Sequence, residues 1–140
     1  DSSIFFITHD LGVVSEIAHR VMVMYAGDVV EHADVETIFE DPKHPYTAAL
    51  IKSRPALSRE RLDRLDFIPG HVPSLVSKPS GCPFHPRCPE AMELCRLAMP
   101  PMHSFSSDHT ARCWLHESES DRSRVEAEYR AAAPGTEEEK

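Results

Sequence analysis

Closely spaced prolines limit what the middle of this 140-residue chain can fold into. Between positions 68 and 101 the prolines are Pro69, Pro73, Pro79, Pro83, Pro86, Pro89, Pro100 and Pro101. Proline has no backbone N–H and clashes with the preceding helical turn, so this spacing excludes long helices and favours an extended, wrapping path. Such a segment builds little core from regular secondary structure, and another interaction must hold it in place.

All the cysteines of the chain lie in or just after this proline-rich segment. They are Cys82, Cys88, Cys95 and Cys113, spaced C-x5-C-x6-C-x17-C. Clustering of every cysteine in a small, loop-like segment is typical of a module that is held together by cross-links or by a metal. The cysteines are therefore the first candidates for a site in this half of the chain.

Several kinds of chemistry remain open for these thiols. Disulfides need an oxidising compartment, and this sequence shows no export signal, although a truncated start would hide one. Zinc accepts four thiolates but usually includes a close C-x2-4-C pair, which is absent here, although His85, His103 or His109 could replace one cysteine. An iron-sulfur cluster accepts wider and irregular spacings, because its ligands reach separate irons. Four unrelated buried thiols are the remaining alternative.

Near the start of the chain, a short apolar run is followed at once by a helical pattern. The run Ile4–Ile7 is too short for a helix and predicts a strand buried on both faces, as in a parallel sheet. Asp10 is a good N-cap for a following helix. Ligands of open α/β sheets bind beyond the carboxyl ends of strands, which is where His9 stands, so we expect His9 to be functional.

The pattern up to about residue 54 predicts the last part of an α/β domain. The run His19–Tyr25 and the shorter run Asp28–Glu31 predict a hairpin with a turn between them. Asp34 is expected to cap a short helix, and Pro45 to begin another. Because a parallel strand needs neighbours that these residues do not supply, we expect residues 1–54 to belong to a larger domain.

Charge separates the end of the chain from the rest. Residues 117–140 are rich in acidic side chains, which predicts a solvated and flexible tail. The net charge of −8 argues against non-specific nucleic-acid binding, and no apolar run is long enough to cross a bilayer. The charged stretch Arg59–Asp66 predicts either a short surface helix or a linker.

Two sets of residues carry a resemblance to a known family. The first resembles the last third of an ABC-transporter ATPase and comprises Phe6–Leu11, Arg20–Val21, Met24–Gly27 and Val30–Glu31. The second resembles one branch, the ATP-binding subunits of dipeptide and oligopeptide importers, and comprises His44–Thr47, Ile68–Gly70, Pro73, Gly81–Phe84 and Arg87–Cys88. The resemblance extends from about Ile4 to Leu115. It implies an α/β fold in which residues 1–54 end an ATPase domain, followed by a proline-rich extension with little regular structure at residues 55–116.

For His9 the resemblance implies the switch histidine, which contacts the γ-phosphate of ATP and helps arrange the attacking water across a head-to-tail dimer of ATPase domains. The sequence contains no G-x-x-x-x-G-K-[ST] phosphate loop and no signature motif. We therefore expect ATP and Mg²⁺ to bind only together with an N-terminal half that supplies those motifs. The chain alone is predicted to be inactive.

For Cys82, Cys88, Cys95 and Cys113 the resemblance favours a [4Fe-4S] cluster, with zinc as the alternative. It further implies a second ATPase subunit and membrane-spanning permease subunits as partners, at the cytoplasmic face of the inner membrane. Neither nucleic-acid binding nor direct membrane insertion is expected. The competing interpretation is a stand-alone metal-binding interaction module without an ATPase role.

Overall fold

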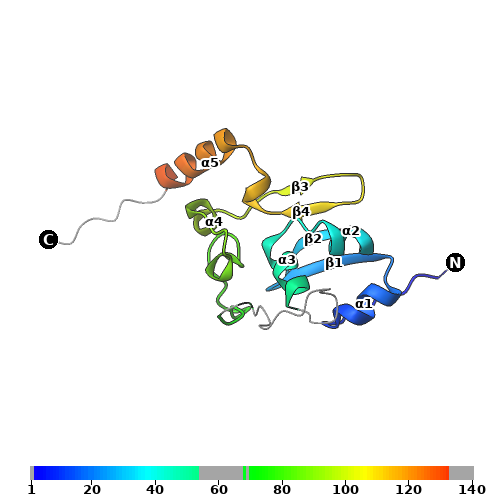
Figure 1. The fold of residues 1–140 in the computed structure, drawn as a ribbon. Helices are drawn as coiled ribbons and strands as arrows, with labels where there is room; N and C mark the ends of the chain where they lie inside the picture. Colours follow the sequence, from blue (N-terminus) through cyan, green and yellow to red (C-terminus); the bar gives the residue numbers. More distant parts are fainter. Residues whose placement is uncertain (1, 54–67, 69, 133–140) are drawn as a thin grey trace.

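A four-stranded antiparallel sheet joins the two halves of the chain in the computed structural model, which describes residues 2–53, 68 and 70–132 (Figure 1). The strand order is β1-β2-β4-β3. The strands are β1 (Arg20–Tyr25), β2 (Asp28–Asp34), β3 (Met102–Ser104) and β4 (Thr110–Arg112). None of the helices in the described ranges is long and apolar enough to cross a membrane.

The predicted hairpin is confirmed as β1 and β2. Its two turn residues, Ala26 and Gly27, have φ angles of 49° and 84°. Positive φ at both positions matches the twist of the flanking strands, and this is the geometry of the favoured two-residue hairpin turns. Pairing runs from Tyr25 opposite Asp28 to Arg20 opposite Asp34, with one register shift after Val23.

The helices of the first half begin where the capping residues predict. They are α1 (Leu11–Ile17), α2 (Val35–Glu40) and α3 (Pro45–Lys52). Asp10 accepts hydrogen bonds from the N–H groups of Gly12 and Val13, and Asp34 accepts from the N–H of Thr37. These side chains satisfy donors that the first helical turn leaves unpaired.

The structure differs from the prediction at Ile4–Ile7, which forms no strand. Its side chains are 90%, 78%, 59% and 87% exposed, and the segment extends away from the sheet (Figure 1). A parallel strand forms only beside neighbours that supply its backbone hydrogen bonds. All strand pairs among the described residues are antiparallel, so this parallel element of the predicted fold class is absent from them.

The second half contains more regular structure than the prolines predict. Besides β3 and β4 it has two 3₁₀ turns, η1 (His85–Arg87) and η2 (Trp114–His116), and two helices, α4 (Glu93–Leu97) and α5 (Glu119–Ala132). Strand β4 pairs with β2, so this half completes the sheet of the first half. Helix α5 occupies part of the segment expected to be a flexible tail. The predicted helix or linker at Arg59–Asp66 lies outside the described residues.

An aromatic cluster forms the centre of the core. The ring centroid of Tyr25 on β1 lies 4.7 Å from that of Tyr46 on α3 and 5.1 Å from that of Phe84. Trp114 is also buried, and its indole Nε1 donates a hydrogen bond of 2.9 Å to the carbonyl of Ala98. Aromatic side chains bury large apolar areas, so this cluster packs the cysteine-containing segment against the first hairpin.

Candidate functional site

The four cysteines line one small cavity, although they come from separate parts of the second half. The cavity has a volume of about 10 Å³, close to the space that one water molecule needs. Three of the side chains are almost fully buried, and Cys88 is partly exposed. All four are free thiols. The structure thus brings together the residues that the sequence singled out.

Local backbone geometry places the first three cysteines. Gly81 has a φ of +66°, and a Cβ at this position would collide with the backbone carbonyl of Cys95. This close approach lets the N–H of Cys82 donate a 2.8 Å hydrogen bond to the same carbonyl. Cys88 follows the 3₁₀ turn η1 and Cys95 lies on helix α4. The glycine therefore fixes one cysteine beside another.

Each cysteine sulfur accepts at least one backbone N–H. The donors are Phe84 and His85 for Cys82, Glu90 for Cys88, Met92 for Cys95, and Leu115 for Cys113. Donors to a sulfur stabilise its negatively charged thiolate form, and hydrogen bonds of this kind accompany thiolates that bind metals. Each of the four sulfurs therefore has a backbone donor that favours its thiolate form.

Burial acts in the opposite direction on the same groups. It raises the pKa of Cys82, that of Cys88 to about 11 and that of Cys113 to about 12, while the neighbouring cysteines add a smaller repulsion. Without a cation these three thiols stay protonated at neutral pH. A cation in the cavity would reverse that preference, because coordinated thiols lose their protons.

Within the described part of the chain, no three histidine, cysteine, aspartate or glutamate side chains are placed to hold one metal ion. Of the histidines considered as zinc ligands, His85 lines the cavity, whereas His103 and His109 do not. The Nδ1 of His85 instead lies 2.9 Å from the carbonyl oxygen of Cys82, and His109 is paired elsewhere.

His44 also lines the cavity, and the sequence analysis did not single it out as a site residue. Its side chain is 1% exposed, and its Nδ1 accepts a 3.0 Å hydrogen bond from the N–H of Tyr46, which caps α3. Burial lowers the pKa of His44 to about 4, so the ring is neutral at physiological pH. In the sequence, His44 stood out only as part of His44–Thr47, one of the segments that carry the family resemblance.

A larger open groove of about 620 Å³ adjoins the cysteine cavity. Helix α3 and the segment Pro86–Glu90 contribute most of its lining. Five residues line both spaces: His44, Pro45, Phe84, Cys88 and Glu90. The cysteine cavity and the solvent-open groove therefore share part of their walls.

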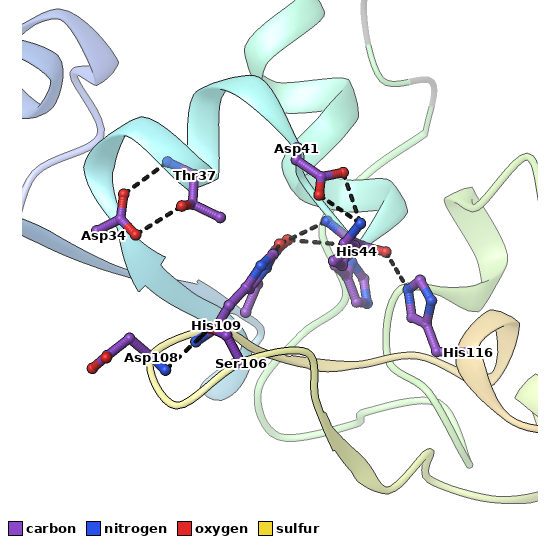
Figure 2. Close-up of polar contacts among 10 residues, drawn as sticks. Asp34, Thr37, Asp41, His44, Ser106, Asp108, His109 and His116 are labelled. Atoms are coloured by element: carbon purple, nitrogen blue, oxygen red, sulfur yellow. Dashed lines mark hydrogen bonds and ion pairs between the residues drawn. The ribbon is translucent and has the colours of Figure 1, made fainter.

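A second buried feature, the carboxylate of Glu31, joins β2 to the later half of the chain. Glu31 is 0% exposed and accepts hydrogen bonds from the N–H groups of Lys43 (2.6 Å) and His44 (2.9 Å). The Nε2 of His109 lies 2.8 Å from the same carboxylate. Figure 2 shows His44, His109 and His116 converging on this region, with His116 Nε2 2.7 Å from the carbonyl oxygen of Lys43.

His9, the predicted catalytic residue, lies apart from both features. It is exposed in the bend before α1 and does not line the cysteine cavity. Its neighbour Asp10 caps the helix through its side chain. The described residues place no other predicted site residue beside His9.

Comparison with known proteins gives matches over most of the chain. Residues 30–95 match the family model described as "Oligopeptide/dipeptide transporter, C-terminal region". The oligopeptide transport ATP-binding protein AppD of Bacillus subtilis is 50% identical over 119 residues, 85% of this chain and 36% of that protein. The oligopeptide transport ATP-binding protein OppD of Salmonella typhimurium is 45% identical over 114 residues, 81% of this chain and 33% of that protein.

The dipeptide transport ATP-binding protein DppD of Escherichia coli is 41% identical over 111 residues, which is 79% of this chain and 34% of that protein. The chain thus spans about a third of the length of the curated relatives it matches.

Proposed function

The chain belongs to the C-terminal region of oligopeptide/dipeptide ABC-transporter ATP-binding proteins, and from this premise we propose that it forms the C-terminal part of an ATP-hydrolysing subunit that drives peptide import. The observation that carries the proposal is the 41–50% identity to transport ATP-binding proteins over about four fifths of the chain. The partners would be a second ATPase subunit and permease subunits, at the cytoplasmic face of the membrane.

The exposed run Ile4–Ile7 supports this proposal. Four consecutive apolar side chains that are 59–90% exposed are unusual on a protein surface and mark a contact with another part of an assembly. In the proposed subunit this contact is a parallel sheet supplied by the rest of the ATPase domain. The same contact would bring His9 from an exposed bend to the edge of a nucleotide site.

The proposed role of His9 is to donate a hydrogen bond to the γ-phosphate of ATP and to orient the attacking water. An imidazole suits this task because it can donate to a phosphoryl oxygen that gains charge in the transition state. The amides and lysine of a phosphate loop, and the ligands of Mg²⁺, would come from the rest of the subunit. The chain alone is therefore expected neither to bind nor to hydrolyse ATP.

A chimera tests this function. The matching C-terminal third of the Escherichia coli dipeptide transport ATP-binding protein is replaced by this chain, and ATP hydrolysis and dipeptide uptake are measured. We expect the chimera to support both, and its His9→Ala variant to bind ATP but hydrolyse it at least 100-fold more slowly. A chimera that folds and binds ATP but supports no uptake would contradict the proposal, as would tight Mg²⁺-dependent ATP binding by the chain alone.

The second part of the proposal is that Cys82, Cys88, Cys95 and Cys113 hold a [4Fe-4S] cluster. Four sulfurs around one cavity, each with a backbone N–H donor, support a soft, thiolate-bound group. A cluster binds each thiolate to a different iron, so it does not require three ligands gathered around a single ion. The cavity must widen to accept it, since its present volume suits one water.

The cluster would link chain segments that are otherwise joined by few regular elements. Cys82 precedes η1, Cys95 lies on α4, and Cys113 follows β4. Binding all of them to one group would hold the proline-rich segment against the sheet, and the binding free energy would add to the folding free energy. A colourless protein that contains one zinc ion would support the alternative metal.

A further inference from the structure

The bend that carries His9 is held on both sides by hydrogen bonds from side chains to the backbone. The hydroxyl oxygen of Thr8 accepts the N–H of Asp10 at 3.0 Å, so this bond spans His9. The carboxylate of Asp10 accepts the N–H groups of Gly12 at 2.7 Å and of Val13 at 3.4 Å. His9 is therefore the central residue of a Ser/Thr turn that leads directly into the N-cap of α1.

These bonds give the backbone at His9 a direction that is independent of any partner. They join residues no more than three positions apart, so the local sequence is enough to form them. The side chain of His9 is exposed, so packing does little to orient its ring. The backbone conformation then decides which rotamers the imidazole can adopt.

Helix α1 connects this bend to the rest of the fold. The carbonyl oxygen of Asp10 accepts the N–H of Val14 at 3.1 Å, at the start of the helix. Beyond the other end of α1, the carbonyl oxygen of His19 accepts the N–H of Val35, the first residue of α2, also at 3.1 Å. Through its cap, Asp10 thus ties the backbone beside His9 to a helix that is itself attached to α2.

We propose that Asp10, assisted by Thr8, is the residue that positions His9 for ATP hydrolysis. This inference rests on the proposed role of His9 at the γ-phosphate. A donor to an oxygen that gains charge in the transition state acts only from a narrow range of positions, and a displacement of about 1 Å can cost about 100-fold in rate. Asp10 acts on the reaction through the hydrogen bonds of its cap and not through its charge.

Paired variants test this role in the chimera of this chain with the Escherichia coli dipeptide transport ATP-binding protein. Asp10→Ala removes the acceptor of the cap, whereas Asp10→Asn removes the charge but keeps an oxygen that caps a helix equally well. Thr8→Val and Thr8→Ser remove and keep the acceptor of the turn in the same way. We expect Asp10→Ala to lower kcat for ATP hydrolysis about 10- to 100-fold, and Thr8→Val about 3- to 10-fold, with little change in KM for ATP. Asp10→Asn and Thr8→Ser should stay within about 3-fold of the unmodified chimera.

The matched control is Asp34→Ala, which removes the cap of a helix that does not carry His9. Asp34 caps α2 by accepting the N–H of Thr37, so its loss should lower the melting temperature of the chimera in the same way as Asp10→Ala. We expect kcat of Asp34→Ala to stay within about 2-fold of the unmodified chimera, because the bend at His9 keeps its own cap. Equal losses of kcat in Asp34→Ala and Asp10→Ala would overturn the inference.

Combining Asp10→Ala with His9→Ala separates positioning from a general loss of structure. A residue that acts only through His9 has no effect once the imidazole is removed, so the double variant should hydrolyse ATP as slowly as His9→Ala alone. A further loss as large as that of Asp10→Ala by itself would overturn the inference, as would equal losses in Asp10→Asn and Asp10→Ala. A chimera without ATP hydrolysis, or one in which His9→Ala keeps the full rate, would refute the proposed function and this inference with it.

Discussion

Removing the carboxylate of Glu31 should destabilise the fold more than any surface change. Glu31→Ala removes the acceptor of two buried donors, the N–H of His44 and the Nε2–H of His109, and of one partly buried donor, the N–H of Lys43. Each unpaired buried donor costs about 1–3 kcal/mol, so the loss of a shared acceptor is expected to cost at least about 3 kcal/mol in total. We expect the free energy of unfolding to fall by about 3–5 kcal/mol, a large part of the stability of a small domain.

Urea unfolding, followed by circular dichroism, measures this loss. Glu31→Gln should cost less, about 1–3 kcal/mol, because one amide oxygen remains as an acceptor while the amide nitrogen faces a donor. The matched control is Glu128→Ala, which removes an exposed carboxylate paired with Arg124 and should change stability by less than about 0.5 kcal/mol. If Glu31→Ala lowers the free energy of unfolding by less than about 1 kcal/mol, the hydrogen bonds to this carboxylate do not stabilise the fold as inferred.

Three further changes are predicted from the geometry. Gly81→Ala should lower the melting temperature and the metal content together, because its Cβ would meet the backbone of Cys95. Gly27→Ala is the control: it has a similar positive φ, but its Cβ would meet only the ends of flexible side chains. It should cost about 1–3 kcal/mol of stability and leave the metal content unchanged. Folding lowers the pKa of His44 from 6.5 to about 4, so between these pH values the unfolded chain binds a proton that the folded chain does not. The free energy of unfolding should therefore fall by about 3 kcal/mol as the pH drops from 6.5 to 4. In urea unfolding, His44→Asn should show a smaller fall across that range. Trp114→Phe leaves the carbonyl of Ala98 unpaired and should cost about 1–3 kcal/mol by the same assay, and no measurable loss would contradict the buried hydrogen bond.

Local signals in the sequence predicted the first half of the fold well. Asp10 and Asp34 cap their helices through contacts within three residues, and the β1–β2 turn depends on two adjacent residues. Such features are decided by neighbouring residues and can be read from a sequence. The prediction of a strand at Ile4–Ile7 was wrong for this structure, because a strand forms only beside partner strands, which the local sequence does not contain.

The contacts that organise the site are distant in sequence, and this is why the sequence alone missed them. Glu31 and His109 are 78 positions apart, and no periodic pattern relates them. The spacing of the cysteines suggested a shared site but left four alternatives open: disulfides, zinc, an iron-sulfur cluster and unrelated buried thiols. The backbone donors to each sulfur, and the buried ring of His44 beside them, follow only from the folded path of the chain.

The most direct test of the account is the iron and acid-labile sulfide content of the chain purified without oxygen, compared with four single cysteine-to-serine variants. The account predicts a brown protein with about four irons and four sulfides per chain, and a marked loss in each of Cys82→Ser, Cys88→Ser, Cys95→Ser and Cys113→Ser. A protein without iron and sulfide, or a variant such as Cys113→Ser that keeps the full content, would contradict the claim that these four thiols form one site.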